Sequence, residues 1–350
     1  MKNQKRREKI INLFLHKERI QSSAVHVALM EMGEIISLPT IKRELSQLVK
    51  DGSLLIENSG RSTDYKISSA GRVFSNIDAK EYCSIEPDKR YGLMSYNFSL
   101  FQSFPSKIFT TEELVRLESA TSIYVKNTEG ISPVAEKKEL ERMVIELSWK
   151  SSKIEGNTYT LLDTEKLILE NTEAKGHNKE EARMILNHKD AFHYVREHKN
   201  DFSSLTRKNI DELHYILTKD LNISRGLRTG IVGVTGSKYR PLDNVYQVTE
   251  AVDNLSLLIS KTQSPYEKAL LALVCIGYIQ PFEDGNKRTS RLMCNALLLA
   301  HSCSPLSYRS VDENEYREAM LVFYELNSLV PIKKIFIDQY QFAALNYAVK

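Results

Sequence analysis

The sequence has no long apolar run, no internal repeat and no low-complexity tract. A membrane-spanning helix needs about 20 consecutive apolar residues, so we expect no membrane segment, and no signal peptide is recognisable, which favours the cytoplasm. The 8 His show no HExxH or comparable ligand spacing, so none is assigned to a metal. The 4 Cys lack a zinc-type pairing and are expected to be reduced, buried thiols.

The composition is that of a globular protein with room for substantial cores. At 350 residues and 42% apolar content, the chain is expected to form two or three domains. We predict a mainly α protein with a separate unit over residues 1–75, a linker and N-terminal region over 76–135, and a helical domain over 136–350.

The segment from Gln280 to Arg291, which reads QPFEDGNKRTSR, is the most informative part of the chain. Before it, residues 269–279 are almost continuously apolar, which predicts a buried helix. After it, residues 289–300 have apolar positions and no helix breaker, which predicts a second helix. Residues 281–286 therefore connect two helices.

The residue types in this connection suit an anion. Gly285 and Asn286 can take turn conformations that direct successive backbone N–H groups at one point, next to the N-terminus of the following helix. Arg288 falls in the first turn of that helix and Arg291 one turn later, so both can face a phosphate. Asp284 can hold Mg²⁺ together with phosphate oxygens. The alternative is an ordinary turn with a capping Asp and solvated arginines.

These residues resemble the signature of Fic-domain proteins, His-Pro-Phe-x-Asp/Glu-Gly-Asn-Gly-Arg-x-x-Arg. The resemblance extends over roughly residues 80–350 and implies a Fic-type helical core that binds ATP with Mg²⁺. It implies a Mg²⁺ ligand at Asp284, and it assigns nucleotide binding to five residues of the loop and following helix. They are Gly285, Asn286, Lys287, Arg288 and Arg291.

Two positions depart from this signature, and the first is Gln280, which stands in the place of the family's catalytic His. In the family reaction a Ser, Thr or Tyr hydroxyl attacks the α-phosphate of ATP, and the His accepts the hydroxyl proton. An amide can position a hydroxyl but is not a useful base. Losing a general base typically costs about 10²- to 10⁴-fold in rate. Gln280 is either natural or an introduced replacement of a His.

The second departure is Lys287, where adenylyl-transferring members usually have Gly. A Lys at this position occurs in members that resemble Doc toxins, which transfer the γ-phosphate, and its ammonium would add a phosphate contact. The retained Arg291 favours the AMP-type geometry instead. A solvated Lys remains a further alternative, since only the backbone N–H is needed here.

Residues 151–157, SSKIEGN, end a charged, periodic stretch from residue 136 that predicts a helix. They resemble the family's inhibitory motif Ser/Thr-x-x-x-Glu-Gly/Asn, with Ser151, Glu155 and Gly156 in the matching places. The resemblance implies that Glu155 pairs with Arg291 and prevents productive placement of the γ-phosphate. The alternative is a helix end with a solvated Glu.

Residues 228–241, RTGIVGVTGSKYRP, alternate β-branched residues with glycines. They resemble the family's flap, a β-hairpin that pairs with the backbone of a target protein. Helices at 209–217 and 313–326 complete the order expected of the family. The alternative is a surface hairpin without a partner. The flap residues assigned by resemblance are Thr235, Gly236, Ser237, Lys238 and Tyr239.

Residues 1–75 have helical patterns at 6–16, 23–32 and 37–50, then strand patterns at 54–57 and 65–68. This order resembles a winged helix-turn-helix. The segment carries 13 Lys and Arg against 8 Asp and Glu, so it holds the basic excess of a chain whose net charge is +3. We expect duplex phosphates to be contacted by four side chains if this unit binds DNA. They are Lys42, Arg43, Lys50 and Arg61. Protein docking or dimerisation with a second copy is the open alternative.

Two classes of function follow. The first is an enzyme that transfers AMP to a hydroxyl side chain of a protein, or of itself, and is slow without the His. The second is a non-catalytic relative in which nucleotide binding regulates a DNA-binding or protein-docking unit. Gln280 favours the second class, and the intact loop, flap and inhibitory Glu favour the first.

Overall fold

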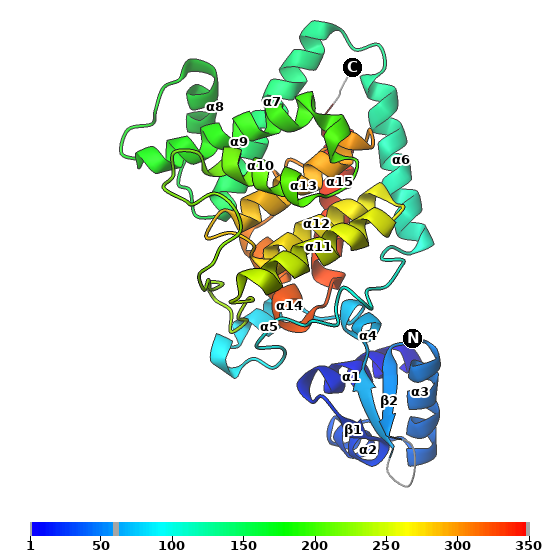
Figure 1. Ribbon diagram of the computed structural model, residues 1–350. Coiled ribbons are helices and arrows are strands. Elements are labelled where there is room, and N and C mark those ends of the chain that lie inside the picture. Colours follow the sequence, from blue (N-terminus) through cyan, green and yellow to red (C-terminus); the bar gives the residue numbers. More distant parts are fainter. Residues whose placement is uncertain (1, 59–62, 348–350) are drawn as a thin grey trace. The chain divides into compact units, whose positions relative to one another are not determined.

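The computed structural model describes residues 2–58 and 63–347, and the chain is mainly α-helical, as predicted (Figure 1). It divides into two compact units. The N-terminal unit comprises Met1–Pro105, Val234–Tyr239 and Glu318–Ile332, and the core unit comprises Ser106–Gly233, Arg240–Arg317 and Lys333–Lys350. Across the described residues, no helix has the length and apolar character needed to cross a bilayer.

The N-terminal unit begins with three helices and a small antiparallel sheet in the order β1-β3-β2. The predicted helices and hairpin strands of this region are confirmed within a few residues. The identification as a winged helix, and the domain boundaries at residues 75 and 135, remain predictions. The elements are α1 (Lys2–His16), β1 (Ile20–Gln21), α2 (Ser22–Glu31), α3 (Leu38–Lys50), β2 (Leu54–Asn58), β3 (Asp64–Ile67), α4 (Ser69–Val73), α5 (Ala79–Ser84) and the 3₁₀ turn η1 (Pro87–Lys89).

Helix α3 owes its place to an apolar stripe. Ile41, Leu45 and Leu48 recur at helical spacing and are buried, so they join the hydrophobic core that this unit forms with α1 and α2. Strand β2 pairs with β3 with Leu54 opposite Ile67, and the register shifts after Ile56. The opposite face of α3 is left exposed to solvent.

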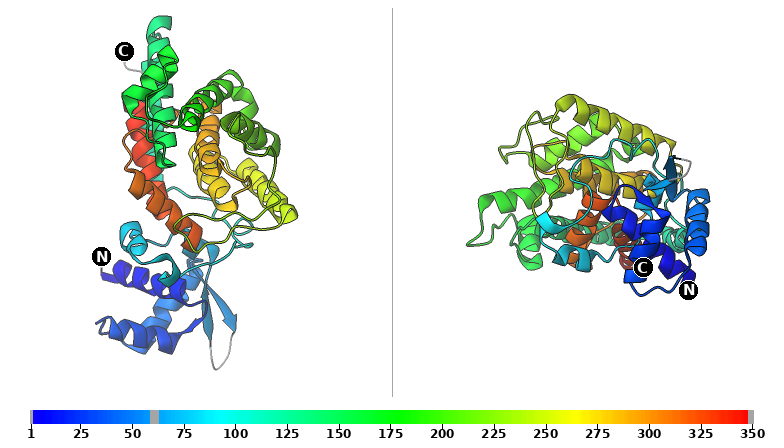
Figure 2. Two further views of the ribbon diagram at one scale, coloured as in Figure 1. Left: turned by 90° about the vertical axis from the view of Figure 1, so that its left-hand side faces the viewer. Right: turned by 90° about the horizontal axis from the view of Figure 1, so that it is seen from below.

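The core unit is built around two helices that are buried almost along their whole length, α12 (Pro265–Ile279) and α13 (Asn286–Ala300). They pack against each other in the middle of this unit, with α11 (Val245–Lys261) on α12 and α10 (Arg207–Thr218) on α13 (Figures 1 and 2). Helices α14 (Glu313–Leu326) and α15 (Val330–Asn346) are divided between the units. The other elements are α6 (Thr111–Thr128), α7 (Pro133–Ile154), α8 (Leu161–Glu170), α9 (Lys179–Glu197) and the 3₁₀ turn η2 (Lys199–Phe202).

Helix α12 forms and ends where its sequence requires. The Ser264 side chain accepts a hydrogen bond from the Glu267 N–H, and Pro265 occupies the first turn, both common at helix starts. From Ala269 to Ile279 the helix is almost entirely apolar on all sides, as expected of a helix enclosed by others. The helix ends at Gln280, which takes the left-handed conformation with φ 51°. The connection to α13 is therefore the loop from Gln280 to Gly285.

The predicted flap differs from its expected hairpin form. The strands of the structure all lie between residues 20 and 67, whereas residues 228–241, all of which are described, contain no strand. A turn at Thr235 and Gly236 is closed by the Ser237 N–H, which donates to Val234 O over 3.1 Å. Residues 234–239 belong to the N-terminal unit, where the Ser237 hydroxyl donates to the buried Glu325 carboxylate over 2.7 Å. Side-chain and turn contacts thus hold this segment without a strand ladder.

Candidate functional site

The loop before α13 is held in one shape by its own side chains. The Asn286 amide reaches back to Phe282, donating to its C=O and accepting from its N–H, each over 2.8 Å. Gly285 has φ 77° and is the N-cap of α13, with no side-chain cap on the helix. A Cβ at Gly285 would lie 3.0 Å from the Thr218 side chain, so this position requires Gly for both conformation and space. The first N–H groups of α13 are therefore available to an anion.

Two buried guanidinium groups stand on the first turns of α13. Arg288 is 2% exposed, and its closest carboxylate is Asp284, with Nη2 3.9 Å from Oδ2. Its Nη1 also donates to Leu217 O over 3.4 Å. Burial lowers the pKa of Arg288 from its usual value, opposed by the charge of Asp284. A buried cation with such distant compensation favours the binding of an anion beside it.

Arg291 is completely buried and, unlike Arg288, has a close carboxylate. Its Nη2 lies 2.8 Å from Glu155 Oε1, as expected from the sequence. The same guanidinium donates to Ser151 twice, from Nε to the hydroxyl over 2.9 Å and from Nη2 to the backbone O over 2.8 Å. Burial by itself would lower the pKa of Arg291, but the charge of Glu155 outweighs it and holds the pKa of Arg291 above the usual value. The inhibitory role of Ser151, Glu155 and Gly156 remains a prediction.

Glu155 also pairs with Lys287, whose Nζ lies 3.4 Å from Oε2. Although burial raises the pKa of Glu155, the charges of Arg291 and Lys287 outweigh it and hold the pKa below its usual value. Glu155 directly follows α7, and Gly156 takes φ 98° to turn the chain away. One carboxylate at the end of α7 thus compensates two cations of α13.

The Gln280 side chain serves as a helix cap in this structure. Its Nε2 donates to Gly277 O over 2.6 Å, which satisfies a carbonyl in the last turn of α12. Its backbone O accepts a hydrogen bond from Arg228 Nε, also over 2.6 Å. Both the side chain and the backbone of Gln280 are therefore held by hydrogen bonds. Its neutral side-chain amide is not basic enough to accept a proton from a hydroxyl.

Asp284 is the residue predicted to bind a metal. Its side chain is 76% exposed, and the described residues contain no group of three or more His, Cys, Asp or Glu that could hold a metal. A single exposed carboxylate fits Mg²⁺ that arrives with phosphate oxygens and water rather than a cage made by the protein. The metal assignment stays a prediction.

Two histidines of the site were not anticipated from the sequence. His214 on α10 is buried, stacks on Phe282 with ring centroids 3.7 Å apart, and has its Nε2 3.0 Å from Asp284 O. His188 on α9 is also buried, and neither of its ring nitrogens has a hydrogen-bond partner among the described residues. Burial lowers the pKa of His214 to about 4 and that of His188 to about 3. The sequence could have indicated them only through their position, since both histidines fall on the apolar face of an amphipathic helix.

The structure also places the predicted DNA-contacting residues. Lys42, Arg43 and Lys50 are exposed on α3, and none of the three forms an ion pair within the described residues. Arg61 lies outside the described residues. The flap residues Thr235 to Tyr239 lie in the N-terminal unit.

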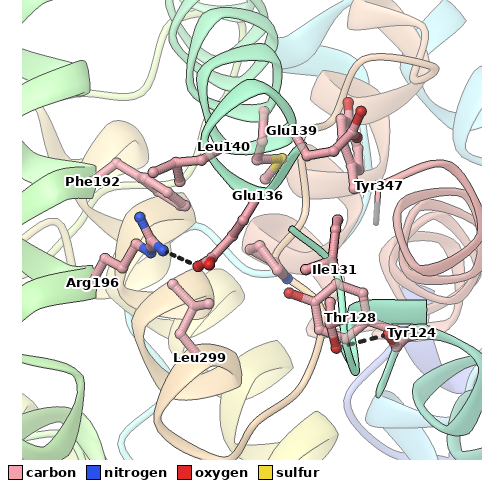
Figure 3. A pocket seen from close by; sticks show the side chains of 12 residues that line it. Tyr124, Thr128, Ile131, Glu136, Glu139, Leu140, Phe192, Arg196, Leu299 and Tyr347 are labelled. Carbon is pink, nitrogen blue, oxygen red and sulfur yellow. Dashed lines mark hydrogen bonds and ion pairs between the residues drawn. The ribbon is translucent and has the colours of Figure 1, made fainter. Parts of the chain in front are cut away.

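A separate cavity of about 330 Å³ lies in the core unit (Figure 3). Leu299, near the C-terminal end of α13, lines it, whereas the loop from Gln280 to Gly285 precedes the N-terminal end of that helix. Its wall is mostly apolar, and the Glu136–Arg196 ion pair, 2.6 Å long, lies at one side. None of the predicted site residues lines this cavity.

Comparison with known proteins agrees with the loop geometry. Residues 204–298, which include α10 and the loop from Gln280 to Gly285, match the model of the Fic/DOC family. These residues form a Fic/DOC domain. The segment 204–298 also contains Arg288 and Arg291 but not Glu155, and of the N-terminal unit it contains only residues 234–239.

Curated relatives of the Fic domain carry the name protein adenylyltransferase Fic. The one from Aedes aegypti is 28% identical over 189 residues, which are 49% of this chain and 35% of the relative. The one from Nematostella vectensis is 30% identical over 174 residues, which are 49% of this chain and 41% of the relative. The matches thus span well under half of each relative's length.

A solved structure supports the fold alone. A Fic domain containing signaling protein from Bacteroides thetaiotaomicron superposes with a TM-score of 0.57 at 20% identity. The match covers 67% of this chain and 95% of that protein. The Fic fold predicted for the core is therefore confirmed.

Proposed function

We propose that this Fic domain binds the phosphates of ATP at the N-terminus of α13 and resembles protein adenylyltransferases in its chemistry. The observation that carries the proposal is Arg288, a guanidinium that is 2% exposed and 3.9 Å from its nearest carboxylate. Phosphate oxygens would supply the missing counter-charge, together with the uncapped N–H groups of the helix. The names of the curated relatives agree with this reaction class.

In this reaction the oxygen of a target hydroxyl forms a bond to the α-phosphorus, the bond to pyrophosphate breaks, and pyrophosphate leaves. The hydroxyl proton must pass to an acceptor. Arg288 and the N–H groups of α13 would hold and orient the phosphates. Asp284 would hold Mg²⁺, which supplies neutralisation of phosphate charge when bound. The acceptor of AMP would be a Ser, Thr or Tyr hydroxyl of another protein or of this chain.

Gln280 is expected to make this activity slow. Its amide donates to Gly277 O, so it does not substitute for a general base, whose loss typically costs about 10²- to 10⁴-fold in rate. The engagement of Arg291 by Glu155 would weaken the reaction further by occupying the counter-charge of the γ-phosphate. Nucleotide binding and AMP transfer should therefore separate in experiments.

Calorimetric titration with ADP and ATP in the presence of Mg²⁺ tests the proposal. We expect binding by the unaltered chain and at least about tenfold weaker binding by Arg288→Ala, because a hydrogen bond to a charged group contributes about 1.5–3 kcal/mol. Arg43→Ala removes an exposed cation of α3 and is the matched control, which should bind as the unaltered chain does. Folded protein that binds neither nucleotide at millimolar concentration would refute the proposal.

A second candidate is a regulator that binds nucleotide without catalysis and contacts DNA through residues 1–75. Three exposed cations of α3, Lys42, Arg43 and Lys50, favour it, because they form no ion pair with any described residue. Protein docking, including pairing with a second copy, is the competing use of the same unit. A phosphotransferase like the Doc toxins is less favoured, since Lys287 already pairs with Glu155. Cytoplasmic location is part of the proposal and rests on the sequence alone.

A further inference from the structure

The ring of His214 contacts the loop from Gln280 to Gly285 in two ways. It stacks on Phe282 with an interplanar angle of 6°, and its Nε2 is 3.0 Å from the backbone O of Asp284. A Cβ placed on Gly285 would be 3.5 Å from His214 Cδ2. A single side chain of α10 therefore contacts the loop at Phe282 and Asp284 and lies next to Gly285.

The direction of the hydrogen bond follows from its partners. Asp284 O is a carbonyl and can only accept, so Nε2 carries the proton and donates. The other ring nitrogen, Nδ1, is buried without a hydrogen-bond partner among the described residues. A proton on Nδ1 would place an uncompensated charge there, so the neutral tautomer with hydrogen on Nε2 is the stable one.

This bond also determines where the next amide points. The peptide bond between Asp284 and Gly285 is trans, like every peptide bond described, and its C=O and N–H are directed to opposite sides. Because the C=O of Asp284 points to His214, the N–H of Gly285 points away from α10. Gly285 is the N-cap of α13, so its amide adds one donor next to the uncapped N–H groups of that helix.

We propose that His214 is a positioning residue for phosphate binding, which holds the peptide between Asp284 and Gly285 so that the Gly285 N–H donates to a phosphate oxygen. This inference rests on the proposed nucleotide site and assigns a role to α10, which the sequence indicated only by its place in the order expected of the family. If the ring of His214 only filled space, any aromatic side chain at residue 214 would support nucleotide binding equally well.

His214→Phe separates these two roles, because it keeps an aromatic ring on Phe282 and removes the donor. We expect it to bind ADP about tenfold more weakly, as for one hydrogen bond to a charged group, while adenosine, which has no phosphate, binds unchanged in ligand-observed NMR titrations. His214→Gln provides an amide donor and should recover most of the ADP affinity. Leu213→Ala perturbs the neighbouring buried position of the same helix and should leave the ratio of ADP to adenosine affinity unchanged.

Equal ADP affinity of His214→Phe and the unaltered chain, or an equal loss for ADP and adenosine, would overturn the inference. Should His214→Phe fail to fold, the unaltered chain labelled with ¹⁵N-glycine decides. The Gly285 amide resonance should then shift on addition of ADP but not of adenosine, and the same response to both would count against the inference. Failure of the unaltered chain to bind ADP at all would instead refute the proposed function.

Discussion

The carboxylate of Glu155 compensates two cations of α13, and its replacement tests the proposed inhibitory contact. Glu155→Gln keeps the shape of the side chain and removes its charge, which leaves the completely buried Arg291 without a carboxylate. Removing one partner of a buried ion pair typically costs about 3–5 kcal/mol. The pair with Lys287 is weaker, since its Nζ is 3.4 Å away and its side chain is 34% exposed, and such pairs contribute about 0–1 kcal/mol.

Thermal and urea unfolding, with and without nucleotide and Mg²⁺, measure both effects. We expect the free energy of unfolding to fall by about 3 kcal/mol in Glu155→Gln and by less than about 1 kcal/mol in Lys287→Ala, the matched control. In Glu155→Gln, ATP should raise the melting temperature more than ADP, because its γ-phosphate can replace the lost carboxylate beside Arg291. The reasoning is refuted if Glu155→Gln unfolds like the unaltered chain, or if ATP and ADP stabilise it equally.

The pH dependence of the same variant provides an independent check. The folded chain holds the pKa of Glu155 below its usual 4.5, so its stabilising contribution is complete above that pH and is lost as the pH falls through the lower folded value. The stability difference between Glu155→Gln and the unaltered chain should therefore be constant near neutrality and shrink below about pH 4.5. A difference that does not change in acid would contradict the assignment of the charge to Glu155.

Three further outcomes are expected. The double variant Gln280→His with Glu155→Gly should transfer clearly more labelled AMP from ATP than either single variant, which is most easily seen as self-labelling. A double variant that binds ATP but transfers no AMP would favour a non-catalytic role. In fluorescence anisotropy, the unaltered chain should bind random duplex DNA at low salt and lose affinity steeply as the salt concentration rises. Replacing Lys42 and Arg43 by Glu should abolish this binding. If the unaltered chain does not bind DNA at low salt, protein docking is favoured. Burial and the two arginines of α13 lower the pKa of His188 to about 3. The free energy of unfolding of the unaltered chain should therefore be highest above about pH 6.5 and fall by about 2–3 kcal/mol by pH 4.5 through this group. The His188→Phe variant should lack this loss, and a variant with the same acid profile as the unaltered chain would contradict the assignment.

Local sequence patterns were sufficient for the helices that carry the site. The apolar run before Gln280 and the breaker-free segment after Asn286 predicted α12 and α13, because burial on all sides and capping act over a few residues. The start of α13 was expected at residue 289, and the structure begins it at Asn286. Asn286 itself accounts for the difference, since its side chain closes the loop on Phe282 and lets the helix start early.

The flap shows where local pattern was misleading. Alternating β-branched residues and glycines in residues 228–241 indicated a hairpin, yet no strand forms there. Strand propensity depends on a partner, and the Ser237 side chain and the Gly236 backbone instead bond to the buried Glu325 and Arg90. These partners lie far along the chain and leave no signal in the segment itself.

The sequence by itself determined the helical class, the helix-connecting loop with Arg288 in the first turn of α13, and the resemblance that pairs Glu155 with Arg291. Only the tertiary structure decided that Lys287 shares that carboxylate, that the Gln280 amide caps α12, and that His214 supports the loop. The physical reason is distance along the chain. Helix periodicity, caps and glycine turns are local preferences, whereas Lys287 meets Glu155 and His214 meets Asp284 only after separate helices pack together.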